Sequence, residues 1–333
     1  MRSPGPMRSR TSPPSAGAAP APTGWTVQSD RVTLGDRVSV AFHRTLRVPE
    51  DDQDYPLPPG LGRLPVHTVE DFAARAPPAW RKHAAVFVPL YQREALWLGF
   101  DGRRWHPNAV TLAAGGVNVI SGHPATDRLS DDSQDYLVVP DQPWLDGFQL
   151  EAGVVRQFVA APLGWKATVG EQLGSEDASA LRIQVFDAVP GRFPDRPPPV
   201  PDRVIAGAPM SLPGGLEMGF AAGGRIAQRI YADPYGADSW QSVPLADLIL
   251  YVVNSEAYEQ ITGQPCHPTP VSPEDYTKAG LPWFEIYDEA RSPLATANWL
   301  HRIKTLSEVD PAAATGPLTI DPSQRRRINP SQP

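Results

Sequence analysis

The chain has 333 residues, of which 41% are hydrophobic and 20% are charged, and its formal net charge is −7. This composition is typical of a folded protein with a continuous core, and the negative charge excludes a general attraction to nucleic acid or anionic lipid. The single cysteine, Cys266, excludes an intrachain disulfide and cysteine-rich zinc sites, and it indicates a reducing compartment.

The 40 prolines exceed the share of roughly 5% that is usual in globular chains. Proline removes a backbone donor and clashes with the preceding helical turn, so prolines inside a domain favour short strands and loops over long helices. The composition therefore predicts a β-rich fold.

The two ends differ in composition from the rest of the chain. Residues 1–24 are rich in Pro, Ser, Ala and Arg and predict a disordered leader, and residues 310–333 predict a disordered tail. The longest apolar runs, Ala84–Leu90 and Leu248–Val253, are far shorter than the ~20 residues that a spanning helix needs, and no secretory signal is present. We therefore expect a cytoplasmic protein without membrane insertion.

Residues 25–189 are predicted to form a β-rich domain or first lobe. Residues 38–48 alternate as a half-buried strand does, and Gly115-Gly116 predicts a hairpin turn. Thr68 and Thr168 each have a capping-type spacing that predicts a short helix. Further strands are expected at 84–89, 93–100, 109–113, 116–120, 136–139, 154–161 and 181–186.

Residues 190–209, centred on Pro197-Pro198-Pro199, predict a proline-rich loop or linker. A loop is favoured because the strands before it need partners from beyond it. Residues 210–309 predict an α+β second lobe. Its expected elements are a hairpin turning at Gly223-Gly224, a helix from Ser272 to Gly280, and a helix over 294–306. Residues 245–253 predict either a buried strand or the start of a helix that continues through Gln260.

The predicted fold class is thus β-rich α+β, with an antiparallel, sandwich-like core and short helices toward the C-terminus. No motif identifies a reaction: the chain lacks a GxSxG elbow, a phosphate-binding Gly-Lys-Ser/Thr loop, a dinucleotide-binding GxGxxG and an HExxH helix. The catalytic residues are therefore unknown, and no cofactor or metal is implied.

Two arrangements of histidine and cysteine merit comment. Cys266 and His267 are neighbours, but in an extended stretch they should point to opposite sides, which disfavours a nucleophile and its base. His106 and His123 flank a predicted hairpin, which would allow them to meet as metal ligands. For His106 and His123, a solvated or core role is the favoured interpretation.

Four blocks mix aromatic rings with charged residues and prolines, at 91–97, 135–147, 230–236 and 281–288. Such rings can stack on sugars or partner side chains while carboxylates and arginines fix the orientation. The same residues can instead seal a core and bond turn backbones. The candidate ligand- or partner-binding residues are Tyr91, Arg93, Glu94, Trp97, Asp135, Tyr136, Asp141, Trp144, Asp146, Arg156, Asp233, Tyr235, Trp283 and Glu285.

Arg156 is a separate signal because it lies inside the apolar strand predicted over 154–161. Its guanidinium needs a partner there, and Asp141, Asp146 and Glu94 are the expected carboxylates. A buried ion pair is favoured over an anion clamp.

The same blocks carry a resemblance that covers most of the predicted folded part. With residues 55–62 and 155–164, they are similar to an uncharacterised family from actinobacteria and other microbes, whose members are often labelled integral membrane proteins. This sequence contains no apolar segment long enough to span a bilayer. The resemblance implies no activity and no catalytic residues.

The leading hypothesis is a binding or assembly module that presents aromatic and acidic loops to a protein partner, a second copy of the chain or a polar small molecule. The alternative is a carboxylate-dependent hydrolase acting on a sugar-like substrate. Its acid and base would be drawn from Glu94, Asp146, Asp233 and Glu285, with two carboxyls within ~10 Å in one pocket. A purely structural subunit is a third hypothesis, favoured if the blocks are buried and an apolar patch of several hundred Å² is exposed.

Overall fold

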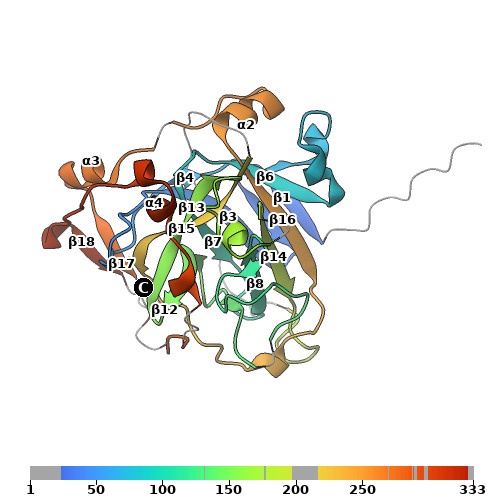
Figure 1. Ribbon diagram of the computed structural model, residues 1–333. Helices are drawn as coiled ribbons and strands as arrows, with labels where there is room; N and C mark the ends of the chain where they lie inside the picture. The colour runs from blue at the N-terminus through green and yellow to red at the C-terminus, as the bar shows by residue number, and fades with distance from the viewer. Residues whose placement is uncertain are drawn as a thin grey trace, which may run out of the picture.

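Short alternating strands dominate the computed structural model, which describes residues 24–130, 132–175, 178–196, 217–268, 270–286, 288, 291–295 and 299–328. Within these residues one large sheet contains 16 strands, and a separate pair, β17 and β18, is parallel. Figure 1 shows β17 and β18 beside α3 at one edge of the molecule, away from β14 and β8.

The elements have the following bounds. The strands of the large sheet are β1 (Trp25–Gln28), β2 (Arg31–Leu34), β3 (Val38–Thr45), β4 (Gly60–Arg63), β5 (His67–Thr68), β6 (Ala85–Pro89), β7 (Ala95–Asp101), β8 (Asn108–Ala114), β9 (Val117–Asn118), β10 (Leu137–Val139), β11 (Trp144–Leu145), β12 (Gly147–Glu151), β13 (Val154–Pro162), β14 (Ala180–Phe186), β15 (Glu217–Ala227) and β16 (Ala246–Val253). The separate pair is β17 (Trp283–Ile286) and β18 (Arg325–Ile328). The α-helices are α1 (Val169–Gln172), α2 (Ser255–Thr262), α3 (Pro273–Lys278) and α4 (Leu306–Val309). The 3-10 turns are η1 (Glu70–Phe72), η2 (Pro78–Lys82), η3 (Ala237–Ser239), η4 (Leu300–Arg302), η5 (Pro311–Ala313) and η6 (Pro322–Gln324).

The main path of the large sheet runs β1-β2-β3-β7-β13-β15-β16-β14-β8-β10. The strand pairs of the large sheet are antiparallel, except that β16 and β6, which lies off this path, are parallel. The prediction of a β-rich fold with a large antiparallel sheet and few short helices is confirmed. Because β15 pairs with β13, and β16 with β14, the two strands that follow residues 190–209 lie between strands that precede them in one sheet. The two predicted lobes therefore share this sheet.

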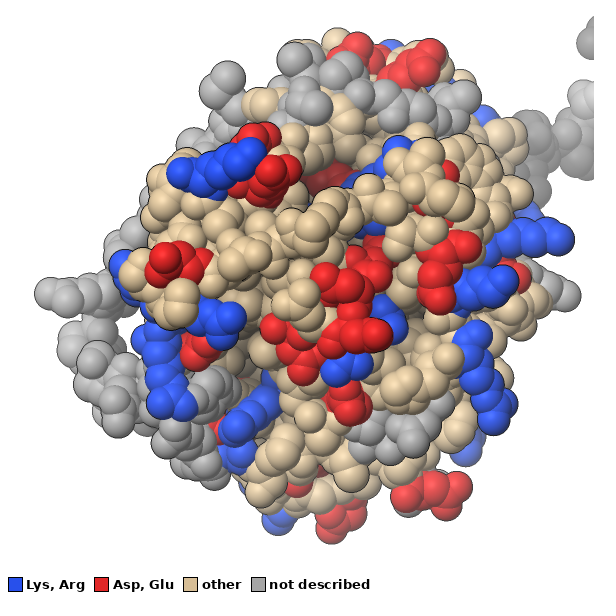
Figure 2. Space-filling model, turned by 60° about the vertical axis from the view of Figure 1, so that its left-hand side comes forward, with Lys and Arg blue, Asp and Glu red and all other residues tan. Residues whose placement is uncertain are grey.

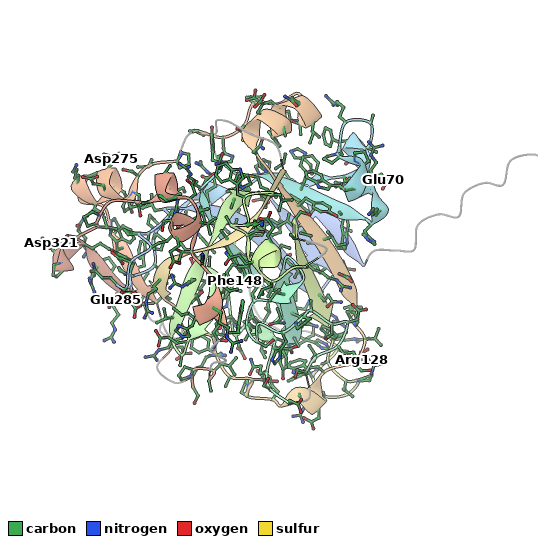
Figure 3. The ribbon with its side chains drawn as sticks, viewed as in Figure 1. Glu70, Arg128, Phe148, Asp275, Glu285 and Asp321 are labelled. Carbon is green, nitrogen blue, oxygen red and sulfur yellow. The ribbon has the colours of Figure 1, made fainter. Side chains whose placement is uncertain are left out.

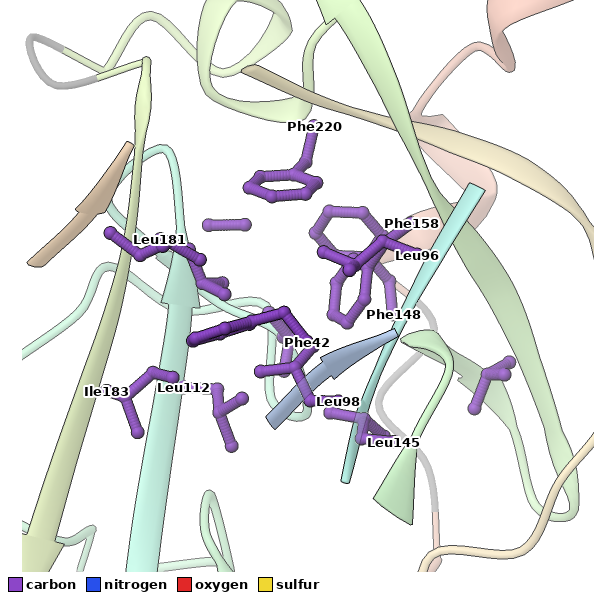
Figure 4. Packing of buried hydrophobic residues seen from close by; sticks show 14 of the residues in the cluster. Phe42, Leu96, Leu98, Leu112, Leu145, Phe148, Phe158, Leu181, Ile183 and Phe220 are labelled. Carbon is purple, nitrogen blue, oxygen red and sulfur yellow. The ribbon is translucent and has the colours of Figure 1, made fainter. Parts of the chain in front are cut away.

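The sheet encloses one large hydrophobic core. Figure 4 shows Phe42 from β3 and Leu96 and Leu98 from β7 approaching Leu112 from β8 and Leu181 from β14, although these strands are far apart in the sheet order. Burying these side chains contributes on the order of 1.5–3 kcal/mol each. The curvature that this core imposes brings loops from distant parts of the chain together.

Several local predictions are confirmed. Gly115 and Gly116 have φ values of 56° and 76°, as a hairpin turn between β8 and β9 requires. Thr168 forms a capping box with Glu171 at the start of α1. Ser272 caps α3, and Gly280 follows the helix with φ of 72°.

The predicted hairpin at Gly223-Gly224 is wrong, because both glycines lie inside the continuous strand β15. A Cβ at Gly224 would lie 2.2 Å from the carbonyl oxygen of Pro49, and one at Gly223 would lie 2.5 Å from a methyl group of Val159. These glycines permit close packing rather than a turn. The strand predicted over 93–100 is present as β7, and the strand predicted over 84–89 is present as β6. These two strands, expected to pair because they follow each other in the chain, do not: β7 pairs with β3, β11 and β13, and β6 pairs with β5 and β16.

The predicted helix over 294–306 is also wrong in the part that the structure describes. Leu294 donates its backbone N–H to the carbonyl of Ile230 at 2.7 Å, and Ile303 is extended. Between them, the residues that the structure describes contain the short turn η4 and no α-helix. The tail differs from its prediction as well: residues 310–328 contain η5, η6 and β18, and Leu318 and Ile320 are buried. Residues 1–23 and 197–216, which include most of the proline-rich segment predicted over 190–209, lie outside the described residues.

No helix among the described residues has both the length and the apolar character needed to cross a bilayer. Figure 2 shows acidic side chains gathered near the centre of one face, with basic side chains beside them. Ion pairs are frequent in this chain, and Arg225, for example, contacts both Asp54 and Glu151 at 2.6 Å.

Candidate functional site

A pocket of about 310 Å³ lies where segments far apart in the sequence meet, between β7 of the large sheet and the pair β17 and β18. Its lining is apolar and aromatic apart from one carboxyl group. The lining residues are residues 57–60, Trp97, Pro143, Trp144, Asp146, Phe284, Ile286 and Ile328. Three of the predicted candidates, Trp97, Trp144 and Asp146, therefore converge here.

Alternate side chains of β7 point away from the core, and Trp97, one of these, forms one wall of the pocket. Leu96 and Leu98 are buried, whereas Trp97 between them is half-buried on the opposite face. The indole stacks on the ring of His43 in β3, with centroids 3.8 Å apart. Gly99 leaves space for this stack, since a Cβ there would lie 3.1 Å from both rings. Burial lowers the pKa of His43 to about 4, so this histidine is neutral at physiological pH.

Asp146 sits at the junction of β11 and β12, and its backbone is fixed on both sides. Its N–H donates to the side-chain oxygen of Gln228, and its carbonyl accepts from the N–H of Phe158, both at 2.9 Å. The next residue, Gly147, must be a glycine, because the chain passes so close to β13 that a Cβ would lie 1.8 Å from the carbonyl oxygen of Arg156. The carboxyl group of Asp146 is thus held in one place.

The Asp146 side chain lacks a counter-ion among the described residues, and one of its two oxygens has no hydrogen-bond partner there. Asp146 is 1% exposed, and its Oδ2 makes no hydrogen bond to any described residue. Burial raises its pKa to about 7, although hydrogen bonds from the side chains of Gln228 and Trp144 act in the opposite direction. An orphaned buried polar atom costs free energy, so the Oδ2 of Asp146 beside a pocket suggests that a ligand supplies the missing bond.

The opposite wall comes from β17 and β18. Leu57 and Phe284 exchange backbone hydrogen bonds of 2.7 and 3.0 Å, which fasten β17 to the proline-rich segment 57–60. Ile328 in β18 faces the pocket beside Ile286, its partner in the parallel register. Phe284 and Ile286 were not among the predicted candidates, although strand alternation places them together on the face opposite Trp283 and Glu285.

Trp283 and Glu285 therefore lie outside the pocket. Trp283 is fully buried in the core, where its indole N–H donates to Thr277 at 3.2 Å. Glu285 pairs with Arg325 at 3.4 Å and is partly exposed. Figure 3 shows Glu285 and Asp321 at the same edge of the molecule, whereas Phe148 lies near its centre.

A second group of candidates forms a hydrogen-bonded network elsewhere. The hydroxyl of Tyr136 donates to Asp233 at 2.7 Å, and the indole of Trp240 donates to the same carboxylate at 2.8 Å. Tyr235 donates its backbone N–H to Asp233 and its hydroxyl to Asp141. Arg291 then pairs with Asp141 at 2.6 Å. These candidates bond one another and the surrounding loops, which fits the structural interpretation of their blocks.

A third group surrounds Glu94, which is fully buried. Its two oxygens accept from Arg44 at 2.5 Å and contact His267 Nε2 at 2.9 Å, and the backbone N–H of Tyr91 also donates to it. Cys266 Sγ lies 3.4 Å from His267 Nδ1, so the prediction that these neighbours point apart is wrong. The thiol is 1% exposed, and burial raises its pKa to about 12, so it is a poor nucleophile.

The remaining candidates lie apart from the pocket. Arg93, with φ of 69°, pairs with Asp310, and Asp135 accepts from the backbone of Ser130. Arg156 donates to the carbonyl of Gly223 at 3.3 Å. None of the ion pairs among the described residues joins it to Asp141, Asp146 or Glu94, so the expected partners are wrong.

Two other features were compared with the pocket. A cavity of about 410 Å³ between η2 and α2 is lined by Arg75, Arg81, Gln260 and apolar side chains, but its described lining includes no buried polar atom without a partner. His106 bonds Asp187 and the carbonyl of Pro194, and the described residues contain no cluster of three or more metal-ligating side chains. The aromatic pocket at Asp146 is therefore the strongest candidate site.

The function of this chain is inferred from the geometry of the site, because the comparisons with known proteins found no match. The resemblance noted in the sequence stays a prediction. Neither a family model, nor a curated protein, nor a solved structure matches this chain.

Proposed function

We propose that this chain is a binding protein and that the aromatic pocket is its ligand site. The proposal rests chiefly on Asp146, a buried carboxyl whose Oδ2 has no partner among the described residues and which borders an otherwise apolar pocket. Ligand sites combine apolar walls with a few fixed polar groups, and Trp97, Trp144 and Phe284 supply the walls here. The ligand is thus a molecule with an apolar body and one hydrogen-bonding group that reaches Asp146.

The alternative, a carboxylate-dependent hydrolase, needs two carboxyls in one pocket. The described lining contributes Asp146 alone. Glu94 is engaged by Arg44 and His267, Asp233 by Tyr136 and Trp240, and Glu285 by Arg325. We therefore favour binding over hydrolysis.

The test uses 2-phenylethanol, a small aromatic probe with one hydroxyl group, and the full chain labelled with ¹⁵N. We expect the probe to shift the indole N–H signals of Trp97 and Trp144 in a saturable manner. Trp97→Ala and Trp144→Ala should each weaken binding by about tenfold, because an aromatic wall contributes on the order of 1–2 kcal/mol.

The matched control is Trp165→Ala, which removes an indole that is 44% exposed outside the pocket. Circular dichroism checks that each variant folds. A probe that binds equally to all three variants would show that the pocket is not the site.

A further inference from the structure

We infer that the pocket is built for an organic cation, an ammonium group carried on an apolar body. This inference rests on the proposed function and names its ligand class. The observations that carry it are the aromatic walls around the pocket, the unpartnered Oδ2 of Asp146, and the distribution of cationic side chains around the site.

The aromatic walls fit a cation. Trp97, Trp144 and Phe284 are half-buried and line the same cavity, so each presents part of a ring to an occupant. The faces of aromatic rings carry negative electrostatic potential, and tryptophan attracts cations most strongly. One face of Trp97 is already covered by the ring of His43, which holds the indole in a fixed orientation.

The carboxyl group at the pocket lacks a counter-ion. Among the described residues no lysine, arginine or histidine pairs with Asp146, whereas the buried Glu94 has Arg44 and His267. A buried carboxylate is costly unless it is paired. An ammonium group would supply both the positive charge and the hydrogen bond that Oδ2 lacks.

The basic strand beside the pocket does not fill this role. Arg325 pairs with Glu285, and Arg326 donates to the carbonyl of Ser323. It is Ile328, not an arginine, that β18 contributes to the lining. A neutral or anionic ligand would leave Asp146 without a counter-ion, so the lining favours a cation over either.

The test compares three probes that share a phenyl body: 2-phenylethylammonium, 2-phenylethanol and phenylacetate. Their dissociation constants for the full chain are measured by calorimetry and by the indole shifts of Trp97 and Trp144. We expect the ammonium to bind at least about tenfold more tightly than the alcohol, and phenylacetate to bind most weakly.

Asp146→Asn should reduce the ratio of ammonium to alcohol affinity to about one. Glu285→Gln removes a carboxylate from β17 outside the lining and should keep the wild-type ratio. If Asp146→Asn does not fold, the order of the affinities of the three probes for the wild-type chain still tests the preference for a cation.

The outcomes separate the two proposals. If the alcohol binds as tightly as the ammonium, the pocket remains a ligand site and the preference for a cation is wrong. If none of the three probes produces heat or shifts either indole, the proposed function itself is overturned.

Discussion

Asp146 and Glu94 are both buried carboxyl groups, and their surroundings give them different roles. Glu94 is enclosed by Arg44, His267 and the backbone of Tyr91, so all of its bonds are internal. Asp146 keeps one oxygen without a partner among the described residues and borders a cavity. Residue type and local sequence cannot separate these two cases, because the partners come from distant parts of the chain.

Glu94→Ala should destabilise the protein by roughly 3–5 kcal/mol, because it leaves Arg44 buried without its counter-ion. Glu285→Ala breaks a partly exposed ion pair and should cost less than about 1 kcal/mol. Urea unfolding of the two variants measures both losses. Similar small losses for the two would contradict a structural role for Glu94.

Cys266 should be unreactive in the folded protein. Burial, reinforced by the negative charge of Glu94, raises the pKa of its thiol to about 12, so little thiolate exists at neutral pH. We expect iodoacetamide to label the native chain at least about 100-fold more slowly than the urea-unfolded chain. Mass spectrometry follows the labelling, and Cys266→Ala is the blank. Rapid stoichiometric labelling of the native chain would refute the burial of this thiol.

At the scale of elements, the sequence predicts strands and caps well where the signal is local. The capping box at Thr168 and the glycine turn at Gly115-Gly116 depend on residues only a few positions apart, and both are present. The helix expected over 294–306 fails because Leu294 bonds Ile230 instead of its own turn. The hairpin expected at Gly223-Gly224 fails because those glycines admit the backbone of Pro49 and the side chain of Val159.

Gly224→Ala tests the close approach that replaced the predicted turn. The added methyl group would meet the carbonyl oxygen of Pro49, so we expect a loss of about 1–3 kcal/mol in the free energy of unfolding. Gly316→Ala is the matched control because nothing lies within 4 Å of its Cβ position. It should change stability by less than about 1 kcal/mol. Equal effects of the two substitutions would mean that β15 does not pack as described.

At the scale of the whole molecule, the pocket depends on contacts that no local pattern reveals. Trp97, Trp144 and Asp146 were predicted as candidates from their blocks, but their meeting with Phe284 and Ile328 depends on the curvature of the sheet and on β18. The tail that supplies Ile328 was expected to be disordered, so this wall was missed. The amino-acid composition of the tail suggested disorder, and it carries no information about the pairing of β18 with β17.

The carboxyl of Asp146 should also make global stability depend on pH. Its pKa is about 7 in the folded chain against an ordinary value of 3.8, so the folded state retains the proton more strongly between these values. The stability that this proton provides is complete below the unfolded pKa and is lost as the pH rises through the folded pKa.

Asp146→Asn cannot lose a proton and should not show this decline. The free energy of unfolding of Asp146→Asn relative to that of the wild type should therefore increase by roughly 2–3 kcal/mol between about pH 5 and about pH 7.5. Urea unfolding at the two pH values measures the difference. Parallel pH profiles for the two proteins would be inconsistent with a buried, unpartnered carboxyl.

The most direct test of the site is the pKa of Asp146, measured by NMR from the pH dependence of its side-chain carboxyl ¹³C shift in the full chain. We predict a value near 7 in the free protein. Saturating 2-phenylethylammonium should lower it, because a neighbouring cation favours the charged form. A carboxyl that titrates near its ordinary value of 3.8 with no probe present would contradict the buried, unpaired acid at this pocket.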